Sequence, residues 1–182
     1  FEAERRGAAR VVAADEFIWA ADPRSRAAFD FAREVLGSNV EPLVQSIENM
    51  SPDESGTFDL VIFMGILYHA PDPLGYLSIC RSLCSDDGVA IVETHSDARD
   101  YGRPAMVFYP GESLNADPTN FWGPNPAAVD AMLTEVGFGS LEHIPDWLEG
   151  RYTVLAHVPA GRGNGPLDGH VSQTPAAPSH GR

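Results

Sequence analysis

The sequence predicts a doubly wound α/β fold, a three-layer sandwich in which a mostly parallel sheet carries helices on both faces and ends in an antiparallel hairpin. Short apolar runs that end in polar or acidic residues alternate with segments of helical periodicity. This alternation is typical of parallel strands that are buried on both faces. The chain has 182 residues, 43% of them hydrophobic, and therefore the size and the core of one domain.

The first half of the chain predicts the end of a helix, then a strand, a helix and a second strand. The opening FEAERRGA is typical of the last turns of a helix that stops at Gly7, so we expect the protein to continue upstream of it. A strand is predicted over residues 9–14 and is closed by Asp15. Apolar residues at helical spacing predict a helix over 24–36, and the second strand follows over about 40–47.

The second half contains the strongest predicted strand and the closing hairpin. Its predicted elements are a strand over 58–64, a helix that begins at Pro73, a strand over 89–93, a helix over 126–136 and an antiparallel hairpin of 138–144 and 151–158. The remaining residues are dominated by Gly, Pro, Ser and Ala, which bury too little apolar surface to offset the entropy of ordering. We therefore expect a domain over 1–158 and a disordered tail over 159–182.

The segment from residue 95 to residue 125 has no clear periodicity and is unusually long for a plain connection. We expect it to be a lid or a substrate loop. Its aromatic rings and amide groups suit a planar or sugar-like substrate, and the predicted substrate contacts are Tyr109, Asn120 and Trp122. Packing of the same side chains on the edge of the sheet explains them equally well, so both interpretations stay open.

The composition excludes several classes of function. The net charge of −14 repels phosphate backbones, so extensive nucleic-acid contact is not expected and a small-molecule substrate fits better. All twelve basic residues are arginines, which excludes chemistries that need a lysine, such as phosphate loops and Schiff-base cofactors. No apolar stretch is long enough to cross a bilayer. Cys80 and Cys84 are four residues apart in a helical pattern, where a disulfide between them would be strained, so we interpret them as buried thiols of a reducing compartment. We therefore expect a soluble, cytoplasmic protein without membrane contact.

In open α/β sheets, ligands bind outside the carboxyl ends of the strands, so the residues that close each strand are candidates for the site. The Asp15 carboxylate could accept both ribose hydroxyls of a nucleoside cofactor, or it could cap a helix or a turn. Ile47 and Glu48 lie at the end of the second strand, where a backbone N–H and an apolar side chain could bind an adenine. An ordinary solvated Glu48 is the alternative.

Three candidate proton acceptors close the later strands: His69, Glu93 and His95. Each could take a proton from a hydroxyl or amine substrate. For the histidines, the alternative role is a hydrogen bond to backbone near the end of the sheet. Glu93, His95 and Asp97 also have the ligand types of a divalent-metal site, but no second clear pair accompanies them, so no metal is expected.

The segment FDLVIFMGILYHAPDPLGYL is the most specific stretch of the chain. It resembles the class I S-adenosylmethionine-dependent methyltransferases, most closely the branch related to the wobble-uridine tRNA carboxymethyltransferases, in which a segment of the form FD-x-V-x-x-MG-x-LYH follows the third strand. The resemblance implies a Rossmann-like sheet, S-adenosyl-L-methionine as the cofactor, and cofactor contacts from Met64 and Tyr68. In this family an acid follows the second strand and an Ile-Glu pair follows the third, matching Asp15, Ile47 and Glu48.

The resemblance also implies a strand and a glycine-rich loop upstream of Phe1, with that strand in the middle of the sheet, between the strands that end at Asp15 and Met64. The predicted function is methyl transfer to a small-molecule or nucleoside-type acceptor by a domain that lacks its first strand here. Two alternatives stay open: a methyltransferase that modifies the tRNA wobble uridine, and a non-catalytic nucleotide-binding fragment. A dinucleotide or nucleotide-sugar enzyme would need a G-x-G-x-x-G loop and a Tyr/Lys pair, and the sequence has neither.

Overall fold

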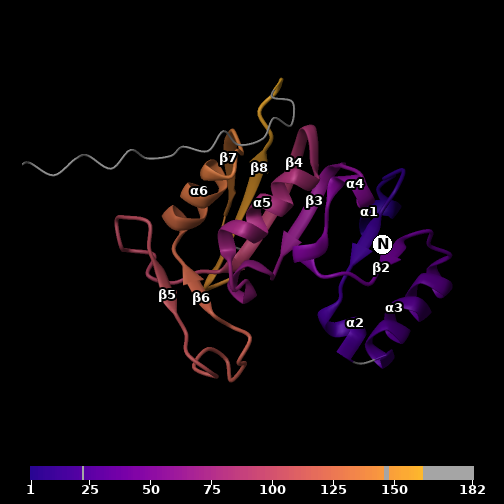
Figure 1. The fold of residues 1–182 in the computed structure, drawn as a ribbon, viewed down its shortest axis with the longest axis horizontal. Coiled ribbons are helices and arrows are strands. Elements are labelled where there is room, and N and C mark those ends of the chain that lie inside the picture. Colours follow the sequence, from indigo (N-terminus) through magenta and orange to yellow (C-terminus); the bar gives the residue numbers. More distant parts are fainter. Residues whose placement is uncertain (22, 146–147, 162–182) are drawn as a thin grey trace, which may run out of the picture.

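The computed structural model describes residues 1–21, 23–145 and 148–161. In chain order the elements are α1 (Glu2–Arg5), β1 (Val12–Ala14), α2 (Phe17–Ala21), α3 (Pro23–Leu36), β2 (Glu41–Leu43), η1 (Ile47–Asn49), α4 (Pro52–Ser55), β3 (Phe58–Met64), η2 (Leu67–His69), α5 (Pro73–Leu83), β4 (Cys84–His95), β5 (Met106–Phe108), β6 (Trp122–Pro124), α6 (Pro126–Glu135), β7 (Ser140–Ile144) and β8 (Arg151–His157) (Figure 1). In the described part of the chain, no helix is both long enough and apolar enough to cross a membrane. The tail predicted over 159–182 lies, after residue 161, outside the described residues.

The larger sheet contains four strands in the order β3-β4-β8-β7. β3 and β4 are parallel, and β8 joins β4 and β7 as an antiparallel neighbour of both. The strand predicted over 58–64 and the closing hairpin are therefore confirmed. The predicted strand over 89–93 is longer than expected, because β4 already begins at Cys84 and its pairing with β3 shifts register between Phe58 and Leu60. The extra residues of β4 at this shift form a bulge, in which one strand carries more residues than its partner.

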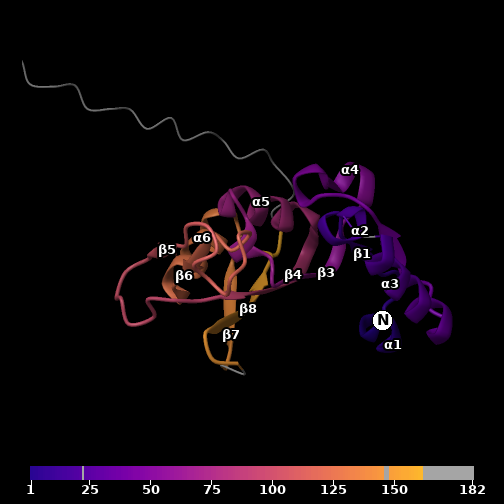
Figure 2. The ribbon, with the colours of Figure 1, turned by 90° about the horizontal axis from the view of Figure 1, so that it is seen from below.

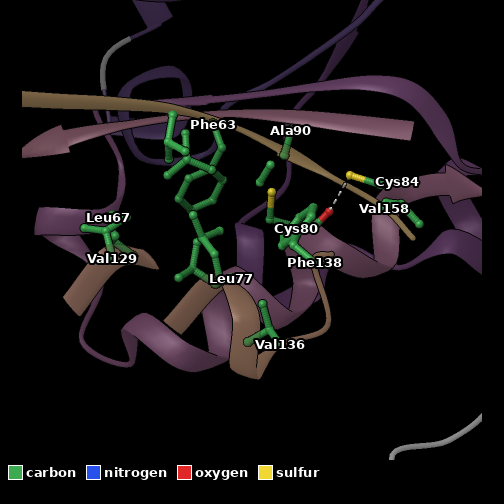
Figure 3. Packing of buried hydrophobic residues seen from close by; sticks show 14 of the residues in the cluster. Phe63, Leu67, Leu77, Cys80, Cys84, Ala90, Val129, Val136, Phe138 and Val158 are labelled. Carbon is green, nitrogen blue, oxygen red and sulfur yellow. Dashed lines mark hydrogen bonds between the residues drawn. The ribbon is translucent and has the colours of Figure 1, made fainter. Parts of the chain in front are cut away.

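The core lies between this sheet and the helices α5 and α6, which cover the same face (Figures 1 and 2). The register pairs Val61 with Ala90 and Phe63 with Val92, and these side chains point toward the helices, as the close view of the core shows for Phe63 and Ala90 (Figure 3). α5 contributes residues at helical spacing, among them the fully buried Leu77. The side chain of Asp72 caps this helix by accepting a hydrogen bond from the Gly75 N–H at 3.0 Å.

The opposite face of the four-stranded sheet keeps exposed apolar side chains. Leu60, Ile62 and Met64 alternate with the core residues of β3, and Ile62 remains 55% exposed. The mixed α/β fold is confirmed, but within the described residues the predicted second helical layer does not lie on this face. α3 instead packs beside α2, next to the smaller sheet.

The smaller sheet contains only β1 and β2, which are parallel. These strands and those of the larger sheet therefore form two separate sheets with an interruption between β1 and β3, since in the described residues each of β1 and β3 pairs on one edge only. A cavity of about 550 Å³ occupies the interruption, lined by both strands together with residues of α1, η1 and α5. We call this cavity the slot. It lies where the resemblance placed a further strand.

Candidate functional site

The carboxyl ends of the strands bring several predicted residues together. Met64, the last residue of β3, is in register with Glu93 on β4. His95, which ends β4, lies opposite Arg151, the first residue of β8. A long segment, residues 96–125, then leaves β4, forms the antiparallel pair β5–β6 and returns beside η2. We call this segment the arm, and together with these strand ends it encloses the candidate site.

Glu93 and Arg151 form a buried ion pair at this end of the sheet. The Arg151 Nε donates to Glu93 Oε1, and its second contact, from Nη2 to Oε2, measures 3.0 Å. The same carboxylate also accepts a hydrogen bond from the Gly65 N–H at 2.9 Å. Because both carboxylate oxygens are engaged, Glu93 is the least free of the three predicted proton acceptors. A catalytic role for Glu93 stays a prediction.

Arg151 is a residue that the sequence analysis missed. Its guanidinium lies 4.9 Å from the centroid of the Tyr68 ring, in the geometry of a cation–π contact. Burial works against the charged form, but hydrogen bonds to Glu93 and Tyr68 outweigh it and raise the pKa of Arg151. The only signal in the sequence was an arginine at the start of a predicted strand, which does not reveal its partner.

The backbone turn after β3 needs its glycine. Gly65 has φ +72°, a left-handed conformation that side chains rarely adopt, and an added Cβ would meet the Tyr68 hydroxyl at 3.9 Å. This turn carries the chain from Met64 to Tyr68, the two residues for which the resemblance implies cofactor contact. Met64 is 41% exposed, so its side chain is available at the end of β3.

His95 has a free ring nitrogen. Its Nε2 is buried, and among the residues that the structure describes it has no hydrogen-bond partner. Burial lowers the pKa of His95, the charge of Asp97 opposes this shift and the charge of Arg151 adds to it. The imidazole is therefore held toward its neutral form, which is the form that accepts a proton.

His69 is engaged differently. Its Nδ1 lies 2.9 Å from the backbone oxygen of Thr119 and 3.0 Å from the Thr119 hydroxyl. This contact joins η2 to the arm, which is the backbone role that the sequence analysis kept as an alternative. His69 therefore has one ring nitrogen, Nδ1, engaged with the arm, whereas His95 Nε2 has no hydrogen-bond partner among the described residues.

Of the predicted cofactor-binding residues, Asp15 directly follows β1, whereas Ile47 and Glu48 lie in η1, because the strand predicted over 40–47 already ends at Leu43. Asp15 Oδ1 accepts the Ile18 N–H at 2.9 Å and so caps α2. Ile47 lines the slot. Glu48 accepts a hydrogen bond from the Tyr76 hydroxyl, which lowers the pKa of Glu48 and links η1 to α5. Their roles toward a cofactor stay predictions.

The arm is anchored at its base by hydrogen bonds to η2, the packing role that the sequence analysis kept open beside the lid or substrate loop. The Phe121 N–H donates to the Tyr68 carbonyl at 2.9 Å, and the Trp122 indole N–H donates to the Ala70 carbonyl at 3.0 Å. Asn120 is buried, and its amide donates to the Leu114 carbonyl at 2.9 Å. Of the three predicted substrate contacts, Trp122 therefore has its polar group engaged in packing, and Tyr109 donates its hydroxyl to Asp97.

The three-residue metal alternative receives no support from the geometry. Glu93 is paired with Arg151, and Asp97 accepts hydrogen bonds from the Tyr109 hydroxyl and from the Ala98 N–H at 2.6 Å. Over the described ranges, no group of three or more His, Cys, Asp or Glu side chains is arranged to hold a metal ion.

Comparison with known sequences gives one family and two kinds of relative. The profile described as "Methyltransferase domain" matches residues 3–143. A ubiquinone biosynthesis O-methyltransferase of Xanthomonas campestris pv. campestris (strain B100) is 38% identical over 55 residues, 30% of this chain and 23% of that protein. A tRNA U34 carboxymethyltransferase of Chromohalobacter salexigens is 33% identical over 90 residues, 48% of this chain and 25% of that protein. The chain thus spans about a quarter of the length of these curated relatives.

Solved structures share the fold at low sequence identity. The N-terminal domain of EvdMO1, crystallised with SAH bound, aligns with a TM-score of 0.64 and 18% identity over 85% of this chain and 67% of that one. An O-methyltransferase family protein from Burkholderia thailandensis aligns with a TM-score of 0.63 and 14% identity over 88% of this chain and 47% of that one. The similarity is one of architecture.

Proposed function

Because the chain belongs to the methyltransferase domain family, we propose that the protein transfers a methyl group from S-adenosylmethionine to a small-molecule or nucleoside-type acceptor. One observation carries the choice of site: the His95 imidazole, whose buried Nε2 has no hydrogen-bond partner among the described residues, lies at the end of β4 with its ring centroid 6.4 Å from that of Tyr68. A neutral imidazole at a strand end is suited to accept the proton that a hydroxyl or amine loses when it is methylated.

The strand ends fit such a cofactor in part. Asp15 uses one carboxylate oxygen to cap α2, and a carboxylate has enough lone pairs to accept ribose hydroxyls as well. Ile47 offers an apolar wall for an adenine, with Glu48 next to it. Met64 and Tyr68 would contact the cofactor near the reacting end. When bound, S-adenosylmethionine supplies an electrophilic methyl group.

The chain's own residues would align the acceptor and move its proton. Methyl transfer is an in-line displacement, so most of the catalytic effect comes from holding the reactants in a near-attack geometry and excluding water. The new bond forms between the acceptor atom and the methyl carbon, the bond from sulfur to that carbon breaks, and the acceptor's proton goes to the His95 imidazole. The arm covers this end of β4 and would limit the access of water.

Titration of S-adenosylmethionine against Asp15 variants of the full-length protein tests the cofactor site. We expect Asp15→Ala to weaken binding by about 1.5–3 kcal/mol, the loss typical of a charge-assisted hydrogen bond. Asp15→Asn keeps a good cap for α2, so it separates the loss of the cap from the loss of the carboxylate. Asp53→Ala, at an exposed position on α4, is the control. An unchanged dissociation constant for Asp15→Ala would leave Asp15 with the capping role alone.

The methionine end of the cofactor needs further hydrogen-bond donors for its carboxylate. We propose that a strand and a glycine-rich loop upstream of Phe1 supply them. The slot supports this proposal. It lies between β1 and β3, and in the described chain neither strand has a pairing partner on the edge that borders the slot. An inserted parallel strand would satisfy the backbone groups of both edges. We expect the 182-residue chain alone to bind S-adenosylmethionine no better than about millimolar. Micromolar binding by this chain alone would refute the proposal.

A tRNA acceptor is the second candidate, and the similarity to a tRNA U34 carboxymethyltransferase is what favours it. The net charge of −14 opposes it, since binding to a phosphate backbone depends on basic residues. Methyl transfer to bulk tRNA compared with small hydroxyl and amine acceptors would separate the two candidates. We also place the protein in the cytoplasm, because Cys80 and Cys84 are both buried free thiols, as expected in a reducing compartment.

A further inference from the structure

Three side chains converge on one glycine of the arm. A Cβ added at Gly123 would lie 3.0 Å from Asp97 Cβ, 3.0 Å from Tyr109 Cε2 and 3.3 Å from His95 Cδ2. These distances are tighter than ordinary van der Waals contact, and the Asp97 atom is attached directly to the backbone. Gly123 therefore allows β6 to approach the end of β4 more closely than any other residue would.

The two residues beside His95 are hydrogen-bonded to each other. The Tyr109 hydroxyl donates to Asp97 Oδ2, and the backbone of Tyr109 is held by a bond from its N–H to the Phe121 carbonyl at 2.8 Å. Burial, followed by the hydrogen bond to Asp97, raises the pKa of Tyr109 to about 12, and the bond from Tyr109 lowers the pKa of Asp97. The phenol stays protonated and the carboxylate ionised across the physiological range, so the contact persists there.

The Tyr109 ring packs against the imidazole of His95. The His95 and Tyr109 ring centroids are 5.9 Å apart with an interplanar angle of 67°, an edge-to-face arrangement. Tyr68 from η2 lies edge-to-face with His95 as well, and Arg151 from β8 lies opposite it in the register. Beside burial, which lowers the pKa of His95, the charge of Asp97 raises this pKa and the charge of Arg151 lowers it.

We propose that Asp97 and Tyr109, seated on Gly123, are positioning residues for His95: their hydrogen bond fixes the Tyr109 ring against the imidazole and so holds in place the imidazole that would take the acceptor's proton. This inference rests on the proposed function and gives Tyr109 a different role from the substrate contact that the sequence predicted. The hydroxyl of Tyr109 is used within the chain, and its ring limits the water that reaches His95.

The pH dependence of methyl transfer by the full-length protein tests this role. The base works in its neutral form, so activity rises with pH through the pKa of His95. Asp97→Asn removes a negative charge that raises this pKa, so the acidic limb of kcat/KM should move to lower pH. Tyr109→Ala exposes the imidazole, removes part of the burial that lowers the pKa, and should move the limb to higher pH. Shifts in opposite directions are the signature of positioning around His95.

A substitution at Gly123 tests the close packing of β6 against the end of β4, and other residues of the arm serve as controls. Gly123→Ala should lower kcat about 10- to 100-fold, because a displacement of about 1 Å in an active site has effects of that size. Gly102→Ala is the matched control, since nothing lies within 4 Å of an added Cβ there, and Asp100→Asn is the exposed control for charge. Both should leave the profile unchanged.

The outcomes separate this inference from the proposed function. Lower activity in Asp97→Asn and Tyr109→Ala without any movement of the acidic limb would mean a purely structural role and would overturn the inference alone. The same holds if Gly123→Ala matches Gly102→Ala. A wild-type protein with no affinity for S-adenosylmethionine would overturn the proposed function, and this inference with it.

Discussion

The two lobes of the chain differ in how many of their side chains are buried. In the C-terminal lobe, residues 58–161, α5 and α6 close a core against the four-stranded sheet. In the N-terminal lobe, residues 1–57, only Val40 and Ser55 are fully buried among the described side chains. Both lobes nevertheless contain strands and helices within the predicted ranges, although β1 and β2 are shorter than the strands predicted over 9–14 and 40–47. Secondary structure alone therefore does not make a core, because the apolar faces also need a partner to cover them.

The helix α3 shows what is missing in the N-terminal lobe. Its sequence places Phe31 and Val35 one turn apart, yet each side chain is 67% exposed. Burial of one such side chain is worth about 1.5–3 kcal/mol, which this lobe does not gain in the described chain. The slot and the exposed residues of β3 lie at the border of the same lobe. A segment that filled the slot would join the two lobes into one sheet.

The largest difference is expected between the ion pairs of the two lobes. Arg151→Met should cost about 3–5 kcal/mol of unfolding free energy, because it leaves the buried Glu93 carboxylate without its partner. Glu41→Gln, which breaks the half-exposed pair with Arg10, should cost less than about 1 kcal/mol. Urea denaturation of the full-length protein measures both. The double variant Glu93→Gln/Arg151→Met should recover much of the loss, and equal losses for the two single variants would contradict the comparison.

The next largest loss of stability is expected when a side chain in the core is truncated. Leu133 on α6 is fully buried, so Leu133→Ala should destabilise the protein by about 2–5 kcal/mol through lost apolar contact and the cavity left behind. The measurement is the denaturation midpoint at an unchanged slope. Leu148→Ala, at a residue that is 51% exposed, is the matched control. A loss below about 1 kcal/mol for Leu133→Ala would mean that the core can collapse around the cavity.

A smaller loss is expected at the start of α6. The Asn125 side chain accepts from the Ala128 N–H at 2.9 Å and donates to the carbonyls of Tyr101 and Arg103, so it caps the helix and holds the arm. Asn125→Ala should cost about 0.5–2 kcal/mol, the usual range for a lost N-cap, with the arm contacts placing it near the upper end. Asn125→Ser keeps an oxygen that can cap the helix but loses the two donated bonds, so thermal unfolding of the two variants separates these contributions.

The smallest effect is expected on the exposed face of α3. Val35→Ser in the 182-residue chain should change its unfolding free energy by no more than about 0.5 kcal/mol, as for other exposed positions. The same substitution in the protein extended upstream sharpens the comparison. A cost above about 1 kcal/mol there would show that an upstream segment covers this face, and equal values in both would show that it does not.

The sequence by itself determined the local structure well. The helices α3 and α5 and the strand β3 lie where periodicity and their end residues predicted them, because helix caps and apolar spacing act within a few residues. The hairpin of β7 and β8 is confirmed for the same reason. The arm was harder to predict: β5 and β6 are three residues each, too short to show a period, and they form because each gains the other as a partner.

The contacts within the candidate site were decided by the tertiary structure. His95 and Glu93 were recognised from their places at the end of a strand, but Glu93 is engaged by Arg151, 58 residues further along the chain. The pairing of Tyr109 with Asp97 and the approach of Gly123 depend in the same way on how β6 lies against β4. No local pattern encodes these distances, because the register of strands distant in sequence sets them. The sequence alone therefore identified which residues could react, and the packing of the strands decided which of them remain free to do so.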